Sequence, residues 1–199
     1  MWDERYSKEE YVYGTQANDF LAENFHLIPK GKILSLAEGE GRNAVFLAQQ
    51  GYTVTAVDSS LVGLEKAQRL AAEKGVKIET IHANIMDFDI QPETWDGIIS
   101  IFCPLTEEQR QQLYPKIVAG LKPQGVYLAE AYPPEQLEYG TGGGQSTLLM
   151  TSKASIERDL TGLHFTRLVQ LEREVLEGTL HTGLAMVVQV LAVKPELQV

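Results

Sequence analysis

Short apolar runs of strand length alternate along the chain with longer segments whose apolar residues recur at helical spacing. The runs that predict strands are 33–37, 53–57, 77–81, 97–102 and 126–132. The segments that predict the intervening helices are 43–50, 61–74 and 106–120. Because strands and helices alternate, the pattern predicts a parallel sheet covered on both faces.

The last part of the chain has a different pattern. Two β-leaning runs, 165–176 and 180–193, flank a short turn, as expected of an antiparallel hairpin. The sequence therefore predicts a Rossmann-like, doubly wound α/β sheet that is mostly parallel and has an antiparallel C-terminal hairpin. Residues 1–199 would form a single domain, with 1–17 as an aromatic N-terminal arm. Pro115 predicts a kink or break in the helix 106–120.

Composition narrows the class of protein. With 199 residues, 44% hydrophobic and 22% charged, the chain suits one soluble globular domain. The net charge of −10 would repel phosphate backbones and anionic lipids, so we expect a small-molecule partner, no nucleic acid, no membrane, and a monomer or weak homodimer. Cys103 is the only cysteine, which favours a reducing, cytoplasmic setting. Scattered Asp, Glu and His offer no metal-ligand spacing, so no metal is expected.

The first predicted strand runs into a turn with two glycines, Gly39 and Gly41, and then into a helix. Glycine permits positive φ and close approach of a ligand, and the free N–H groups of a helix start can bind one. Asp58 ends the second strand about twenty residues later, where a carboxylate can accept hydrogen bonds from both ribose hydroxyls. The alternatives are a turn that uses glycine for geometry alone and an Asp58 that only caps a helix.

The turn suits two kinds of cofactor, dinucleotides and S-adenosylmethionine. Glu38 and Glu40 lie where a dinucleotide would place its pyrophosphate, and like charges there are costly. A cationic sulfonium and an ammonium would be favoured instead. An NAD(P)-dependent reductase is therefore the weaker interpretation.

At this point the sequence resembles the class I S-adenosylmethionine-dependent methyltransferases. The motifs in order are I-L-S-L-A-E-G-E-G, V-T-A-V-D-S-S, H-A-N-I-M-D-F, W-D-G-I-I-S-I-F and L-K-P-Q-G-V-Y-L. The resemblance implies a seven-stranded sheet of order 3-2-1-4-5-7-6 in which only the seventh strand is antiparallel. The stretches W-D-E-R-Y, Y-V-Y-G-T-Q-A-N-D-F-L and L-H-T-G-L-A-M-V-V-Q-V-L-A-V-K-P look most like the tellurite-resistance-type subgroup.

The resemblance also implies roles for individual residues. Gly39 and Gly41 would face the methionyl and ribose parts of the cofactor. The ribose hydroxyls would be held by Asp58, with Ser59 beside it. The adenine would meet Asn84 and Ile85, and the reacting methyl would lie near Ile101 and Phe102. The aromatic arm would fold over the site as a lid carrying Tyr11 and Tyr13, unless these rings only pin the arm to the core.

The chain departs from the family pattern at Ser35 and Ala37, where the family has an acid and a further glycine. Ser35 cannot supply the negative charge expected for the cofactor ammonium. Glu38 or Glu40 is the candidate replacement, and the alternative is that both are solvated turn carboxylates.

The sequence thus predicts a methyltransferase that acts on a small acceptor, with a chalcogen oxyanion or a thiol as one candidate. Methyl transfer from a sulfonium needs positioning and exclusion of water, and a soft nucleophile needs no base. His181 is the candidate catalytic base or hydrogen-bond partner, although a lone histidine is more often structural. A non-catalytic S-adenosylmethionine-binding sensor or scaffold remains an alternative.

Overall fold

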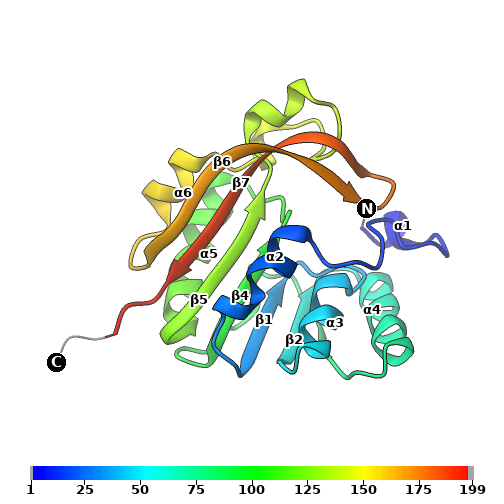
Figure 1. The fold of residues 1–199 in the computed structure, drawn as a ribbon, viewed down its shortest axis with the longest axis horizontal. Helices are drawn as coiled ribbons and strands as arrows, with labels where there is room; N and C mark the ends of the chain where they lie inside the picture. The colour runs from blue at the N-terminus through cyan, green and yellow to red at the C-terminus, as the bar shows by residue number, and fades with distance from the viewer. Residues whose placement is uncertain (1, 197–199) are drawn as a thin grey trace.

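The computed structural model describes residues 2–196 of the chain. Its centre is a seven-stranded sheet with the order β3-β2-β1-β4-β5-β7-β6 (Figure 1). The strands are β1 (Lys32–Leu36), β2 (Thr53–Asp58), β3 (Glu79–His82), β4 (Trp95–Ile101), β5 (Leu121–Ala131), β6 (His164–Glu177) and β7 (His181–Val193). Pairs among β1 to β5 are parallel, whereas β7 is antiparallel to both β5 and β6. The predicted fold class and strand order are confirmed.

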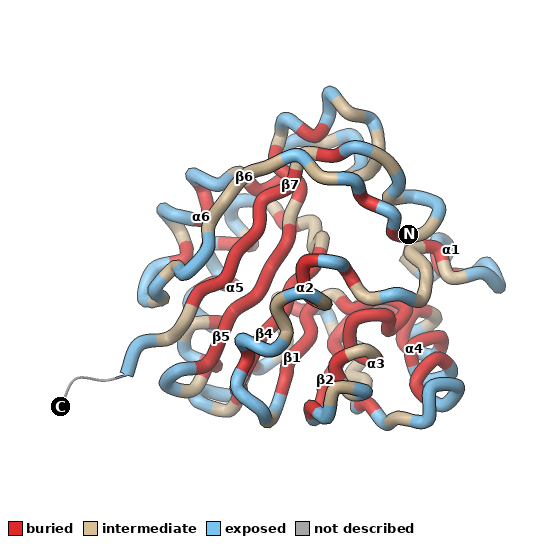
Figure 2. The backbone as a smooth tube through the Cα atoms, viewed as in Figure 1, coloured by how far each residue is buried: buried red, intermediate tan, exposed pale blue. Residues whose placement is uncertain are grey.

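Helices cover both faces of the sheet. The helices are α1 (Trp2–Tyr6), α2 (Asp19–Asn24), α3 (Arg42–Gln49), α4 (Leu61–Glu73), α5 (Glu107–Gly120) and α6 (Lys153–Asp159), with 3₁₀ turns at Phe25–Leu27, Pro134–Glu138 and Thr147–Leu149. Apolar residues of α2, α3 and α4 pack in one core cluster, and those of α5 and α6 in the other. Successive residues of β1 alternate between these clusters, Ile33 in the first and Leu34 in the second, because strand side chains alternate faces. Figure 2 shows the buried residues concentrated along β1, β5 and β7.

Of the kink or break predicted at Pro115, the break is wrong. Helix α5 runs unbroken from Glu107 to Gly120 with Pro115 inside it. Its start is secured by a capping box in which Thr106 and Gln109 exchange hydrogen bonds, and Leu113 and Ile117 are buried against the sheet. Burial of this apolar face offsets the one backbone hydrogen bond that proline removes. None of the helices within residues 2–196 is long and apolar enough to cross a membrane.

The N-terminal arm is fastened to α4 by one buried lysine. Lys66 Nζ donates to the backbone carbonyls of Lys8 and Glu10, at 2.9 and 2.6 Å, and forms an ion pair with the Glu40 carboxylate. Glu40 in turn accepts a hydrogen bond of 2.9 Å from the Val12 N–H. The arm therefore wraps around a charge pair that connects α4 with the turn after β1.

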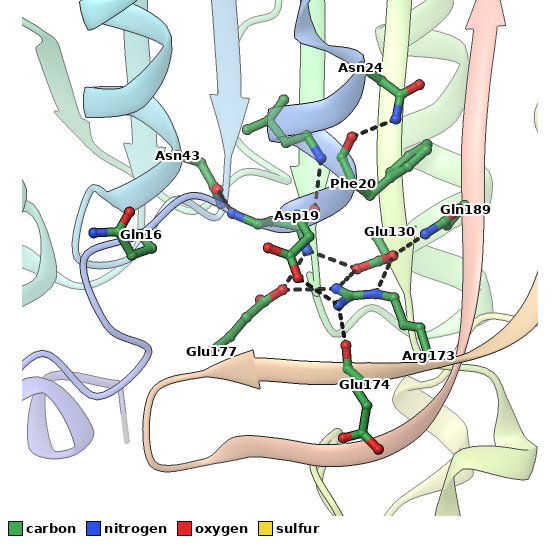
Figure 3. A network of polar contacts seen from close by, with 12 residues as sticks. Gln16, Asp19, Phe20, Asn24, Asn43, Glu130, Arg173, Glu174, Glu177 and Gln189 are labelled. Carbon is green, nitrogen blue, oxygen red and sulfur yellow. Dashed lines mark hydrogen bonds and ion pairs between the residues drawn. The ribbon is translucent and has the colours of Figure 1, made fainter.

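A second buried polar network joins the start of α2 to the C-terminal hairpin (Figure 3). The Asn18 side chain caps α2 by accepting from the Leu21 N–H and donates to both Glu130 and Glu177. Arg173 of β6 forms ion pairs with the same two carboxylates. Because these groups come from α2, β5 and β6, the network fixes the hairpin relative to the parallel part of the sheet.

Candidate functional site

A cavity of about 350 Å³ lies at the carboxyl ends of the parallel strands. It is walled by the loops after β1, β2, β3, β4 and β5 and is closed by the arm and the start of β7. The predicted site residues that line it are Glu38, Glu40, Asp58, Ser59, Asn84, Ile85, Ile101, Phe102, Tyr13 and His181. Strand ends of a parallel sheet are the usual place for a ligand where the strand order reverses. Here the reversal lies between β1 and β4.

Three predicted residues do not line the cavity: Gly39, Gly41 and Tyr11. Tyr11 instead donates its hydroxyl to the Lys66 carbonyl at 3.2 Å, and its ring packs against the core cluster of α2, α3 and α4. This contact matches the alternative in which the ring pins the arm to the core.

The two glycines allow close backbone packing around the turn. Gly39 and Gly41 have φ of +68° and +95°, a region that disfavours side chains. A Cβ at Gly41 would lie 2.6 Å from Ala67 Cα, and one at Gly39 would lie 2.7 Å from the Tyr6 hydroxyl oxygen. The glycines thus let α4 and the arm approach the turn.

Ala37 shows why the methyltransferase pattern has a glycine at this position. Its φ is +53°, and Phe102, at the end of β4, has φ +51°. A side chain in this left-handed region costs about 1–2 kcal/mol. The two strained residues end the adjacent strands β1 and β4 on either side of the cavity, and strained backbone of this kind is often found at ligand sites.

Asp58 is held in place by the backbone around it. Its two carboxylate oxygens accept hydrogen bonds from the N–H groups of Gly39 and Ser60, both at 2.8 Å. Burial raises the pKa of this carboxyl group. Since each carboxylate oxygen can accept more than one hydrogen bond, Asp58 retains acceptor capacity towards the cavity. The cap of α4 is Ser60, which leaves Ser59 on the cavity wall.

Glu38 fills the N-terminus of α3. One of its carboxylate oxygens accepts from the N–H groups of Asn43 and Ala44, at 3.1 and 3.0 Å, and the other accepts from the Ser35 hydroxyl. Burial raises its pKa. A carboxylate at this helix start accepts hydrogen bonds from the free N–H groups, and its negative charge repels a phosphate. The site therefore disfavours a pyrophosphate, which agrees with the expectation against a dinucleotide.

Glu40 has a different environment. Its side chain is 2% exposed and its charge is balanced by Lys66. It is therefore not a solvated turn carboxylate, and its negative charge is already neutralised. Of the two candidate acids, Glu38 is the one without an ion-pair partner among the described residues.

Four rings form one wall of the cavity. The ring of His181 lies 4.6 Å from that of Tyr13, 5.0 Å from Phe102 and 5.3 Å from Tyr132, measured between centroids, and Phe102 stacks on Tyr132 at 4.3 Å. His181 Nδ1 and the Tyr132 hydroxyl are buried and have no hydrogen-bond partner within residues 2–196. Burial lowers the pKa of His181 to about 4, so that the imidazole is neutral at pH 7.

Sequence reasoning missed several wall residues. Among them are Trp2, Arg5, Tyr6, Arg42, Tyr132, Gly143, Met150 and Thr151. The spacing of Trp2, Arg5 and Tyr6, which puts them on one side of a helix, was an available signal. A Cβ at Gly143 would lie 2.8 Å from the Tyr132 ring, so this glycine lets its loop pack closely against Tyr132. Burial raises the pKa of Cys103 to about 12, which keeps it an unreactive thiol.

Comparisons with known proteins agree with this geometry. Residues 33–125 match a family model described as a methyltransferase domain. The ubiquinone biosynthesis O-methyltransferase of Rickettsia conorii is 34% identical over 99 residues, which are 50% of this chain and 34% of that protein. The chain thus matches only about a third of that relative's length.

Solved structures share the fold at low sequence identity. TehB from Haemophilus influenzae superposes with a TM-score of 0.74 at 18% identity, covering 97% of this chain and 65% of that one. An S-adenosylmethionine-dependent methyltransferase from Methanosarcina mazei gives 0.68 at 15% identity, covering 90% and 99%. The chain therefore shares its fold with solved structures described as S-adenosylmethionine-dependent methyltransferases.

Proposed function

We propose that this chain transfers a methyl group from S-adenosylmethionine to a small-molecule acceptor. Residues 1–199 would act as a single methyltransferase domain, with 1–17 as its lid; Met1 and residues 197–199 lie outside the described residues. The observation that carries the proposal is Asp58, a buried carboxylate that is fixed by two backbone N–H groups at the end of β2 and lines the cavity.

The donors and acceptors of the cavity fit this cofactor. Asp58 would hold the ribose hydroxyls, Asn84 and Ile85 would meet the adenine, and Glu38 would face the ammonium. The helix start that a dinucleotide would use is filled by Glu38, whereas S-adenosylmethionine has no phosphate. Bound there, the cofactor would supply an electrophilic methyl group on a sulfonium.

The protein's own contribution is positioning and exclusion of water. The arm, through Tyr6 and Tyr13, and the glycine loop at Gly143 close the cavity over the strand ends. The rings of Phe102, Tyr132 and His181 would shape the acceptor side. A neutral imidazole with a pKa near 4 is a weak base, so His181 would orient an acceptor by hydrogen bonding rather than take its proton.

This weak base favours soft acceptors that need little activation, which supports a thiol or a chalcogen oxyanion. TehB among the solved structures is in line with the tellurite-resistance-type subgroup. The curated relative is an O-methyltransferase, so a hydroxyl acceptor is the competing class. An oxygen nucleophile of high pKa would need a stronger base than His181.

Titration calorimetry with S-adenosylmethionine and its demethylated product tests the cofactor. Incubation with labelled cofactor and a panel of a thiol, selenite, tellurite and a phenol tests the acceptor. Binding with transfer to the thiol or oxyanion is the expected result. Binding without transfer to any acceptor would favour a non-catalytic sensor, for which the weak base is the supporting observation. Absence of binding would refute the proposal.

The buried imidazole predicts a specific loss of stability in acid. The pKa of His181 is about 4 in the folded chain and about 6.5 when unfolded, so the unfolded state binds more protons between these values. Stability contributed by the neutral ring is present above pH 6.5 and falls as the pH drops towards 4. At pH 4.5 the loss should be about 2–3 kcal/mol relative to pH 7.

Urea unfolding of the wild type and His181→Gln at pH 7 and pH 4.5 measures this loss. Burial also raises the pKa of the Glu38 and Asp58 carboxyl groups, but these groups are common to both proteins. The free energy of unfolding should therefore drop less in the variant by about 2–3 kcal/mol. Equal drops in the two proteins would show that His181 does not resist protonation.

A further inference from the structure

One cationic side chain in the cavity wall has no acidic partner among the described residues. Arg5 of α1 lines the cavity and forms none of the ion pairs of residues 2–196. We propose that Arg5 is the counter-ion for the carboxylate at the methionyl end of the cofactor, so that the arm itself carries a binding residue into the site. The inference rests on the proposed function.

The first support is that the usual receptor for an anion is already occupied. A helix N-terminus binds carboxylates through its free N–H groups. At α3 these groups, on Asn43 and Ala44, donate to the chain's own Glu38. A cofactor carboxylate placed there would compete with Glu38 and be repelled by it.

The second support is the charge inventory of the wall. Its two cationic side chains are Arg5 and Arg42. Arg42 is 8% exposed at its side chain and is paired with Glu177. Lys66, behind the turn, forms an ion pair with Glu40 and donates hydrogen bonds to the arm carbonyls. Arg5 is therefore the cation with its charge still available.

The third support is that Arg5 is held in a defined position while keeping donors free. It donates one hydrogen bond to the Tyr13 hydroxyl at 3.0 Å, and its guanidinium lies 4.7 Å from the centre of the Trp2 ring. A guanidinium has five N–H donors in a fork that matches a carboxylate. Stacking on an aromatic face leaves the edge of that fork free.

The position of Arg5 also suits the methionyl end of the cofactor rather than its adenosine end. Asp58 ends β2 and Asn84 follows β3, towards one edge of the sheet, whereas Tyr13, whose hydroxyl accepts a hydrogen bond from Arg5, has its ring against His181 of β7. A ligand whose adenosine lies over β2 and β3 would extend its other end towards β1 and β4, below Tyr13 and Arg5.

Calorimetry with two ligands and three variants tests the inference. The ligands are S-adenosylhomocysteine and 5′-methylthioadenosine, which keeps the adenosine and the thioether but lacks the amino acid. In Arg5→Gln the dissociation constant for S-adenosylhomocysteine should rise about 10- to 30-fold, while that for methylthioadenosine changes less than about twofold. Arg5→Lys, which keeps the charge but not the fork, should fall in between.

Lys8→Gln is the matched control, because it removes one positive charge from the same arm at an exposed residue outside the cavity wall. It should leave both dissociation constants within about twofold. Equal weakening of both ligands by Arg5→Gln would mean that Arg5 only holds the arm, and no weakening would mean that it contacts neither; both results overturn the inference. If the wild type binds neither ligand, the proposed function fails along with it.

Discussion

Replacing Lys66 with methionine should lower the free energy of unfolding by about 3–5 kcal/mol, because removing one partner of a buried ion pair leaves the other charge uncompensated. The side chains of Lys66 and Glu40 are only 1% and 2% exposed, so the Glu40 carboxylate could not regain water without opening the structure. The carbonyls of Lys8 and Glu10 would lose their donor as well. Urea denaturation followed by circular dichroism measures the change.

Two controls separate the orphaned charge from lost packing. Lys66→Met combined with Glu40→Gln removes both charges and should recover part of the stability, since replacing a whole buried pair is much less costly than breaking it. Lys74→Met, at the exposed end of α4, should change the stability by less than about 0.5 kcal/mol. A double variant no more stable than Lys66→Met alone would contradict the role assigned to the charge pair.

Asp58→Ala should weaken binding of S-adenosylhomocysteine by about 100-fold, if the carboxylate holds the ribose hydroxyls as proposed. Charge-assisted hydrogen bonds contribute about 1.5–3 kcal/mol each, and two of them would be lost. Calorimetry gives the dissociation constant directly, and a thermal melt without ligand reports any separate loss of stability. Such a loss is expected, because the Gly39 and Ser60 N–H groups also bond to Asp58.

Asp58→Asn keeps the shape of the side chain and one of its oxygens, so it should fold more readily than the alanine variant yet bind about tenfold more weakly than the wild type. Glu65→Ala, at an exposed position of α4, is the control for a change in net charge and should bind normally. Normal binding by both Asp58 variants would remove the ribose assignment and the observation on which the proposed function depends.

The fold could be predicted because its determinants are local in sequence. Alternating apolar runs and helical segments specify the parallel part, and the hairpin follows from two β-leaning runs around a tight turn. The break expected at Pro115 was wrong because the sequence does not show how much of α5 is buried against the sheet. Tertiary packing outweighed the local cost of proline.

The position of the site could be predicted, but the residues that pair with and pack against its side chains could not. The ends of the strands mark Asp58, Asn84 and Phe102, and the structure brings them to one cavity. Glu40 looked like a ligand for a cationic cofactor, but its partner is Lys66, on the next helix, and pairing of this kind depends on tertiary structure. The glycines alone do not identify a ligand site, because positive φ and close approach serve helix packing as well as ligand binding.

The order of strands in the sheet has a consequence for how the molecule is made. Strand β7 lies between β5 and β6, although it is synthesised after both. Until residues 181–193 emerge, β5 is an open edge, β6 has no neighbour to pair with, and His181 is missing from the cavity. An unpaired edge of this kind invites association with other chains. A nascent chain that contains β6 but not yet β7 therefore exposes unpaired strand edges and is prone to aggregate.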